Sequence, residues 1–200
     1  MKKAILAVLL LSGVMAQPVL AQEWFVRGGA TLVDPTGDNG VLAGYDANIS
    51  SNTQLGLTFG YHFSPNLAIE VLAATPFSHE VSLAGLGVVA EFKHLPPTVS
   101  LQYYFNPEGT VSPFVSAGLN YTWTFDEETK GALNGNNITI GNSFGLAGQA
   151  GLRFALANGW DIVADARYID LSADVKLNGN NIGNADVNPM VYSIMFGKRF

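Results

Sequence analysis

One stretch of twelve residues decides how the rest of the chain is interpreted. It reads His94-Leu95-Pro96-Pro97-Thr98-Val99-Ser100-Leu101-Gln102-Tyr103-Tyr104-Phe105. After the two prolines, apolar side chains at every second position alternate with more polar ones. This period of two predicts a β-strand with one face against an apolar medium and the other in a wetter place. Taken alone, the strand would suit a soluble β-sandwich or a membrane barrel.

The same alternation recurs in eight segments along the chain. We expect strands over residues 24–33, 54–63, 67–75, 97–105, 112–125, 143–156, 160–171 and 189–200. The connections between them are alternately long and short. The long ones are expected to be polar loops, at residues 34–53, 76–96, 126–142 and 172–188. The second of these has room for local structure around residues 81–92.

This sorting of the connections determines the predicted fold class. Short turns at residues 64–66, 106–109 and 157–159 carry the turn formers Pro, Asn and Gly. In an up-and-down barrel, strict alternation places every long loop at one end, as outer-membrane barrels do. We therefore predict an all-β protein, an eight-stranded antiparallel up-and-down transmembrane β-barrel. An even number of strands would put both termini on the periplasmic side.

The beginning of the chain and its composition fit this class. Lys2 and Lys3 precede an apolar run at residues 4–11, and Ala21 suits cleavage, which predicts a secretory signal peptide over residues 1–21. Residues 22–200 would form the barrel. No later apolar run is long enough for a membrane helix. The net charge of −6 argues against a nucleic-acid partner, and the absence of cysteine removes disulfides and thiolate metal sites.

Aromatic residues mark the expected edges of the membrane. One group falls near the short turns: Trp24, Phe63, Phe105, Phe154, Trp160 and Phe200. A second group falls near the long loops: Tyr121, Trp123, Phe125, Phe144, Tyr168 and Tyr192. Because these positions share the outward parity of their strands, we interpret them as two girdles at the lipid–water boundaries. The alternative is that aromatic residues simply favour strands.

The last expected strand carries a signal for assembly. Its apolar face is interrupted by Lys198 and ends at Phe200. An alternating strand that ends in phenylalanine resembles the signal by which the barrel-assembly machinery of the outer membrane recognises its substrates. We therefore expect this machinery to be a partner of the chain.

Several motifs resemble those of the OmpW family of small outer-membrane proteins. They are Ala74-Thr75-Pro76-Phe77-Ser78-His79-Glu80, Lys93-His94-Leu95-Pro96-Pro97-Thr98 leading into Leu101-Gln102-Tyr103-Tyr104-Phe105, Ser112-Pro113-Phe114-Val115-Ser116-Ala117-Gly118-Leu119-Asn120-Tyr121, and Arg199-Phe200. The resemblance implies a narrow, largely apolar barrel that passes small hydrophobic molecules across the outer membrane of a Gram-negative cell. It also implies that some relatives serve as bacteriocin receptors.

Parity places a set of polar and charged side chains inside the barrel. They are Arg27, His62, Glu70, Gln102, Arg153, Asp161, Asp165 and Arg167. Charges in so small an interior should be paired, because an unpaired buried charge is costly. One interpretation is a plug of ion pairs that fills the periplasmic half and fixes the strand register. The other is a polar lining that selects what passes.

Leu72 shares the inward face of its strand with Glu70. An apolar inward group can form a constriction that repels ions and water but tolerates an apolar solute. It can equally be filler, since side chains commonly fill small barrels. We expect Leu72, Phe77, Leu95 and Phe114 to line a pocket at the external mouth.

No motif in the sequence indicates catalysis or a cofactor. His79 and His94 flank the second long connection, but their spacing matches no metal-ligand pattern, so we expect packing or capping at the mouth. Ser78 is adjacent to His79, and adjacent strand side chains point to opposite faces. No nucleophile elbow, phosphate loop or zincin motif is present. We expect no enzyme, no metal and no cofactor.

Two functional hypotheses remain. The first is an outer-membrane channel for small hydrophobic molecules. Its solute would continue down the lumen or leave sideways into the membrane where Pro76, Pro96 and Pro97 weaken the ladder. The second is a non-conducting barrel with a shut lumen, acting as a binding protein or receptor, for example for a bacteriocin, or as a structural protein. The expected partners are outer-membrane lipid and a small hydrophobic solute.

Overall fold

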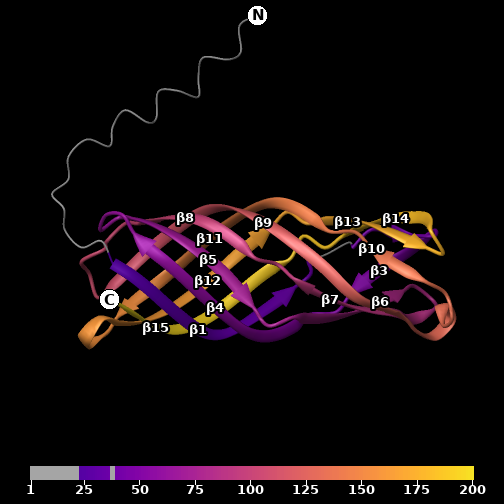
Figure 1. Ribbon diagram of the computed structural model, residues 1–200, viewed down its shortest axis with the longest axis horizontal. Helices are drawn as coiled ribbons and strands as arrows, with labels where there is room; N and C mark the ends of the chain where they lie inside the picture. Colours follow the sequence, from indigo (N-terminus) through magenta and orange to yellow (C-terminus); the bar gives the residue numbers. More distant parts are fainter. Residues whose placement is uncertain (1–22, 37–38) are drawn as a thin grey trace, which may run out of the picture.

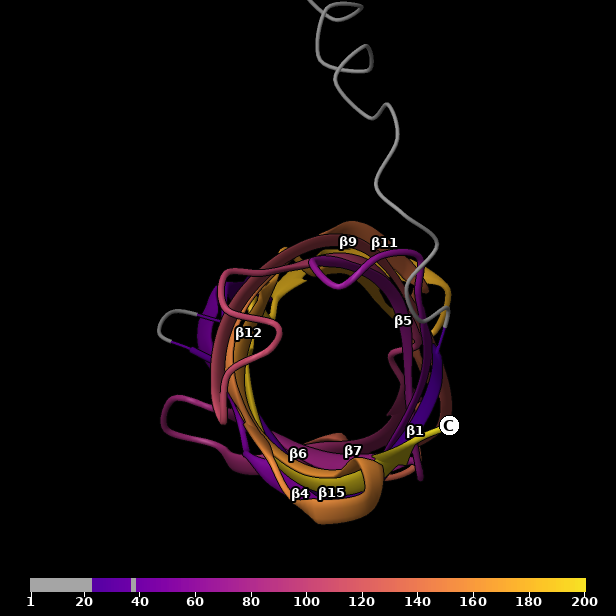
Figure 2. The same cartoon turned by 90° about the vertical axis from the view of Figure 1, so that its left-hand side faces the viewer.

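Eight long antiparallel strands close into a cylinder in the computed structural model, which describes residues 23–36 and 39–200 (Figures 1 and 2). They are β1 (Glu23–Asp34), β4 (Asn52–His62), β5 (Leu67–Ala74), β8 (Thr98–Tyr104), β9 (Val111–Thr129), β11 (Ser143–Ala155), β12 (Trp160–Ile169) and β15 (Met190–Arg199). Each pairs with the next in this order, and β15 returns to β1. The predicted eight-stranded up-and-down barrel is confirmed. The predicted signal peptide and Gln22 lie outside the described residues.

The cylinder closes along the seam between β1 and β15. The register runs from Phe25 opposite Arg199 to Asp34 opposite Met190. Gly29 lies within this seam, and a Cβ atom at its position would be 2.0 Å from the carbonyl oxygen of Ile194. Only glycine allows the two backbones to approach so closely here.

The outer surface of the cylinder is apolar. Leucine, valine, isoleucine and aromatic side chains of alternate residues point outward, and Leu146 and Ile194 are 64% and 67% exposed. The positions between them, such as Thr58 and Ser100, are buried. A continuous exposed apolar belt is unusual on a soluble protein but is what a barrel presents to acyl chains. The alternation predicted from the sequence is therefore the division between lipid and lumen.

Aromatic side chains border this belt at both ends. Trp24, Phe63 and Phe105 are exposed near the short turns, whereas Tyr121 and Trp123 are exposed toward the long connections. Neighbouring rings pack on one another, for example Trp160 on Phe196 and Tyr103 on Phe105. The two aromatic groups thus lie where girdles at the membrane boundaries are expected.

The long connections contain strands, which corrects the prediction that they are polar loops. They form β2 (Val41–Leu42), β3 (Tyr45–Ile49), β6 (Phe77–Leu83), β7 (Gly87–Leu95), β10 (Ile138–Ile140), β13 (Ser172–Leu177) and β14 (Asn180–Asp186), together with the short 3-10 helix η1 (Gly131–Leu133). A second 3-10 helix, η2 (Ala157–Gly159), occupies a short turn. Only the local structure anticipated in the second connection was foreseen.

These short strands extend the wall of the barrel at the long-loop end (Figure 1). β7 pairs with the end of β9 that leads into the third long connection, and β6, β3 and β2 follow β7 in the sheet. β10, β13 and β14 form a separate sheet, and the amide of Ala43 donates to the carbonyl of Ile182 at 2.8 Å, linking that sheet to β2. We call this extension the outer ring. Its strands form because they bury alternate aliphatic residues inside, such as Ile138 with Ile140.

None of the helices among the described residues is both long enough and apolar enough to cross a membrane.

Candidate functional site

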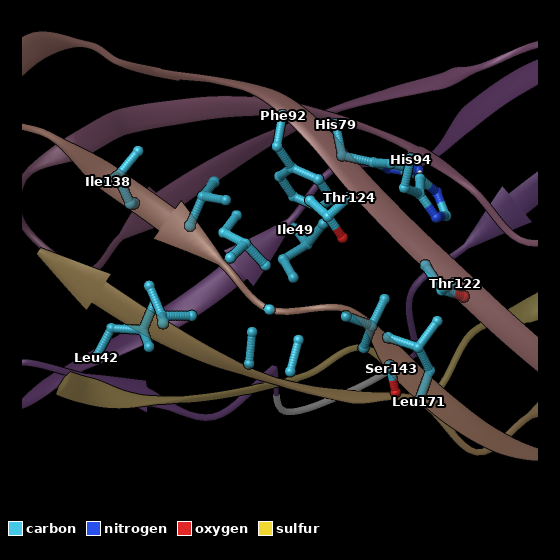
Figure 3. A pocket seen from close by; sticks show the side chains of 17 residues that line it. Leu42, Ile49, His79, Phe92, His94, Thr122, Thr124, Ile138, Ser143 and Leu171 are labelled. Carbon is cyan, nitrogen blue, oxygen red and sulfur yellow. Dashed lines mark hydrogen bonds between the residues drawn. The ribbon is translucent and has the colours of Figure 1, made fainter. Parts of the chain in front are cut away.

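The interior of the outer ring contains an apolar pocket (Figure 3). Its lining residues are Leu42, Ile49, His79, Val81, Phe92, His94, Thr122, Thr124, Ile138, Ile140, Gly141, Ser143, Leu171, Ala173, Val175, Ala185 and Val187. The cavity volume is about 20 Å³, which is room for about one water molecule. The walls would therefore have to move apart before a larger molecule could bind.

The two ends of the pocket differ in polarity (Figure 3). His79, His94, Thr122 and Ser143 lie at one end, and Leu42 and Ile138 lie at the other. Thr122 pairs with Ser143 across the upper edge of the barrel, so the polar end faces the lumen. The aliphatic end lies toward the tip of the outer ring. A molecule in the pocket would place its apolar part outward and any hydrogen-bonding group toward the barrel.

His79 and His94 contact each other through their Nε2 atoms, which are 2.9 Å apart. The Nδ1 atom of His79 lies against the carbonyl oxygen of Ser50, so it carries the proton and donates there. Its Nε2 is then the acceptor, and the Nε2–H of His94 is the donor. This hydrogen-bond pattern assigns the tautomers of both neutral rings.

The histidine pair is uncharged at neutral pH. The outward side chains of β6 and β7, such as Glu80 and Lys93, are polar, so these strands lie beyond the lipid belt. Burial, and secondarily the neighbouring His79, lowers the pKa of His94 to about 3. Burial also lowers the pKa of His79, against the opposing effect of its hydrogen bond to Ser50. The pocket is therefore a neutral environment.

A layer of neutral hydrogen-bonding side chains lies below the pocket. The amide of Asn120 donates to the carbonyl oxygens of Pro96 and Pro97, at 3.1 and 3.2 Å, and to the Thr98 hydroxyl at 3.0 Å. The Thr122 hydroxyl donates to the carbonyl oxygen of the Asn120 side chain at 2.8 Å. Asn120 thus provides hydrogen-bond donors for the backbone carbonyls where the two prolines interrupt the strand.

Buried ion pairs occupy the lumen toward the short-turn end. Arg27 donates from Nε and Nη2 to both carboxylate oxygens of Asp161, each at 2.9 Å, and its Nη1 lies 3.6 Å from Glu70. Arg167 donates to the other oxygen of Glu70 at 3.0 Å. Arg27, Glu70, Asp161 and Arg167 are all almost fully buried. We call this group the ion-pair plug.

Amides and hydroxyls surround the ion-pair plug. Asp165 accepts from Gln149 at 2.8 Å, and the Gln102 amide lies 3.4 Å from the carbonyl oxygen of the Gln149 side chain. Arg153 donates to Ser112 and to the carbonyl of Pro107, both at 2.6 Å. His62 contacts the rings of Phe25 and Tyr104. The polar side chains that parity assigned to the interior are thus buried or half-buried there.

The four side chains expected at the external mouth do not come together. Leu72 and Phe77 are buried inside, with Leu72 near the top of β5 and Phe77 at the start of β6. Leu95 alternates with buried His94 and lies on the outer face, beside Trp123. Phe114 faces inward but packs on Tyr104 near the short turns, so its expected place at the mouth is wrong. None of the four lines the pocket.

The pocket is built mainly from residues that sequence reasoning assigned to loops. A signal for them was present: Ile138 and Ile140, Ala173 and Val175, and Ala185 and Val187 each bracket a polar residue. These short alternations indicate strands with one apolar face. His79 and His94 were placed at the mouth, but their mutual contact was not foreseen.

An antiparallel eight-stranded cylinder with a lipid-facing belt and an apolar outer pocket defines a small outer-membrane β-barrel protein. The chain belongs to the OmpW family, whose model matches residues 21–200. The Gram-negative outer membrane is therefore its location, as the sequence resemblance implied.

Similar proteins support this assignment. Outer membrane protein W of Vibrio cholerae serotype O1 is 37% identical, with all of both chains covered. The NMR solution structure of the Escherichia coli outer membrane protein W matches with a TM-score of 0.65 and 35% identity, over 90% of this chain and 98% of that one. The solid-state NMR structure of outer membrane protein AlkL in DMPC bilayers gives a TM-score of 0.67 and 26% identity, over 93% and 97%.

Proposed function

We propose that this protein is an outer-membrane channel for small hydrophobic molecules. The observation that carries the proposal is the apolar pocket of the outer ring, which lies above a layer of neutral side chains and, below that layer, a lumen filled with paired charges. Aliphatic walls favour an apolar solute because its transfer from water removes apolar surface. The ion-pair plug disfavours further descent, because the solute would have to displace buried, hydrogen-bonded charges.

The solute leaves sideways, through a break in the strand ladder. Pairing between β5 and β8 ends at Leu72 opposite Thr98, and pairing between β6 and β7 resumes at Phe77 opposite His94. Among the described residues, no backbone hydrogen bond joins the segments between these two points, residues 73–76 and 95–97. Pro76, Pro96 and Pro97 fall in these segments, and proline cannot donate to a ladder.

Three of the four residues expected at the external mouth flank this break and would form a gate. Leu72 ends the part of β5 that is paired with β8, Phe77 begins β6, and Leu95 ends β7 on the outer face. Together they offer an apolar path from the interior to the belt of acyl chains. Leu72 then acts as a barrier between this path and the polar lumen below.

The orientation follows from the general plan of outer-membrane barrels. The short-turn end, with Glu23 and Phe200, faces the periplasm, and the outer ring projects from the cell. The last strand presents Phe200 to the barrel-assembly machinery during insertion. The other partners are outer-membrane lipid and the solute itself; no catalytic activity and no cofactor are assigned.

Uptake measurements test the transport proposal. Naphthalene uptake is compared in cells with the parent protein, without it, and with Ala173→Trp, which places a large side chain at a buried lining position and takes the space that a solute would need. Ala84→Trp places the same side chain at an exposed turn and serves as the matched control. Uptake should fall severalfold without the protein and with Ala173→Trp, but not with Ala84→Trp. Equal rates in all four strains reject transport.

The second candidate is a non-conducting barrel that acts as a binding protein, a receptor (for example for a bacteriocin) or a structural element. The filled lumen favours it, because ions have no open path past the ion-pair plug. A planar-bilayer recording combined with Leu72→Arg separates the two candidates. A shut barrel without a gate shows no current and no change in naphthalene permeation on substitution, whereas the lateral channel loses permeation with Leu72→Arg.

A further inference from the structure

One of the two histidines that line the pocket has an unused hydrogen-bond acceptor. Two neutral imidazole rings hold four nitrogens, and three of them are engaged in the links from His79 to Ser50 and from His94 to His79. The fourth, Nδ1 of His94, carries a lone pair, and within the described part of the chain the only hydrogen bond of the His94 ring is the one through its Nε2. In a pocket walled mostly by aliphatic side chains, such an atom is a specific point of recognition.

Two hydroxyl groups of the same lining complete the pattern. The hydroxyls of Thr124 and Ser143 make no side-chain hydrogen bond to any residue that the structure describes, whereas the Thr122 hydroxyl is already used by Asn120. A hydroxyl can donate one hydrogen bond and accept two. The polar end of the pocket thus offers one fixed acceptor and two rotatable donors.

We propose that the pocket selects neutral apolar molecules that carry one hydroxyl group, as alcohols and phenols do, with the hydroxyl donating to Nδ1 of His94. The inference rests on the proposed transport function and names its substrate class. The ligand oxygen accepts from Thr124 or Ser143, while its hydrocarbon part lies among the aliphatic residues toward Leu42 and Ile138 (Figure 3).

The same geometry disfavours carboxylates. None of the residues found to line the pocket is Lys, Arg, Asp or Glu, and the histidine pair is neutral. A carboxylate in this position would be buried without a counter-charge, which is strongly unfavourable. An unsubstituted hydrocarbon would leave Nδ1 of His94 unpaired and would gain no hydrogen bond. A hydroxyl is therefore the best match to the polar end.

Three probes with one ring system test the inference. Naphthalene, 2-naphthol and 2-naphthoate are titrated by fluorescence into the protein in lipid nanodiscs, and signals from protein-free nanodiscs are subtracted. We expect 2-naphthol to bind about tenfold more tightly than naphthalene, the factor that about 1.4 kcal/mol gives, and 2-naphthoate to bind most weakly. In His94→Leu, the advantage of 2-naphthol should shrink to less than about threefold, while naphthalene binds as before.

Two further variants keep the test decisive. His62→Leu removes the buried histidine at the opposite end of the barrel and should leave the preference unchanged. His94→Gln restores a hydrogen-bond acceptor and should recover part of the preference for 2-naphthol. Equal binding of naphthalene and 2-naphthol overturns the inference, and so does an undiminished preference for 2-naphthol in His94→Leu. Either result would leave the proposed function standing, provided that naphthalene binds to the parent protein and no longer binds to Ala173→Trp. Absence of any naphthalene binding contradicts the proposed function itself.

Discussion

The two halves of the barrel interior solve the same packing problem with opposite chemistry. Inside the outer ring, most of the lining side chains are aliphatic, and among the described residues the only titratable ones that line the pocket are the two neutral histidines. Toward the short turns, inward positions hold arginines and carboxylates in bidentate and bridging pairs. The half that lies beyond the lipid is apolar inside, and the half within the lipid is charged inside. This difference is what the proposed function requires, namely one half that admits a solute and another that stays shut.

Breaking the ion-pair plug should produce the largest effect. Asp161→Ala leaves the Arg27 guanidinium buried beside a single, more distant carboxylate. Removing one partner of a buried pair typically destabilises a protein by about 3–5 kcal/mol. Equilibrium unfolding in urea with lipid vesicles measures this loss.

A double variant distinguishes a lost charge partner from a lost contact. Arg27→Met combined with Asp161→Leu removes both charges and keeps apolar volume, so it should lose much less stability than Asp161→Ala. If the single variant is as stable as the parent, the ion-pair plug does not hold the shut half together.

Lowering the pH should also weaken the outer half. Both histidines have a lower pKa in the fold than the ordinary value of 6.5, and that of His94 is about 3. The unfolded chain therefore binds more protons over this range, so stability is full above about pH 6.5 and falls as the pH approaches about 3.

The difference between two proteins isolates this contribution from that of the carboxylates. Thermal unfolding midpoints in detergent are measured from pH 7 to pH 3 for the parent and for His79→Phe with His94→Leu. The double variant should show a flatter pH dependence. If the unfolding midpoints of the two proteins fall in parallel as the pH is lowered, the two histidines bind protons equally well in the folded and unfolded chains, which contradicts the prediction.

The smallest effect is expected at the surface of the outer ring. Lys93 and Asp126 form an ion pair at 3.3 Å, with both side chains well exposed. Exposed pairs of this kind contribute less than about 1 kcal/mol, so Lys93→Ala should change the free energy of unfolding by no more than that. A loss comparable to that of Asp161→Ala would show that the two regions do not differ as argued.

Which face of a strand a residue occupies could be predicted from the sequence, but its neighbours on the adjoining strands could not. Period two correctly placed Phe114 inside and Leu101 outside. The neighbours depend on the register between strands that are distant in sequence, such as Phe114 opposite Gly151, and alternation carries no information about that register. The position of Phe114 at the short-turn end, in contrast, could have been predicted, because this residue closely follows the short turn at residues 106–109.

The outer ring shows a second limit of the sequence pattern. Its strands are short, and β10 has only three residues, so each alternation is too brief to stand out from a loop rich in Asn and Gly. The contact of His79 with His94 depends on a hairpin register that shifts between Val81 and Ser82. That irregularity is a property of the folded pair of strands, and neither histidine reveals it alone.

The seam between β1 and β15 has a consequence for how the protein folds. The amide of Trp24 donates to the carbonyl of Phe200, and the amide of Phe200 donates back to Trp24. The two edges that must meet are therefore far apart along the polypeptide, and closing so large a loop costs entropy before any contact compensates it. Topologies dominated by such distant pairings fold slowly. Until β1 and β15 pair, both edge strands remain free to pair with strands of other chains. A protein that binds β15 during folding would therefore shorten the time in which the chain can aggregate.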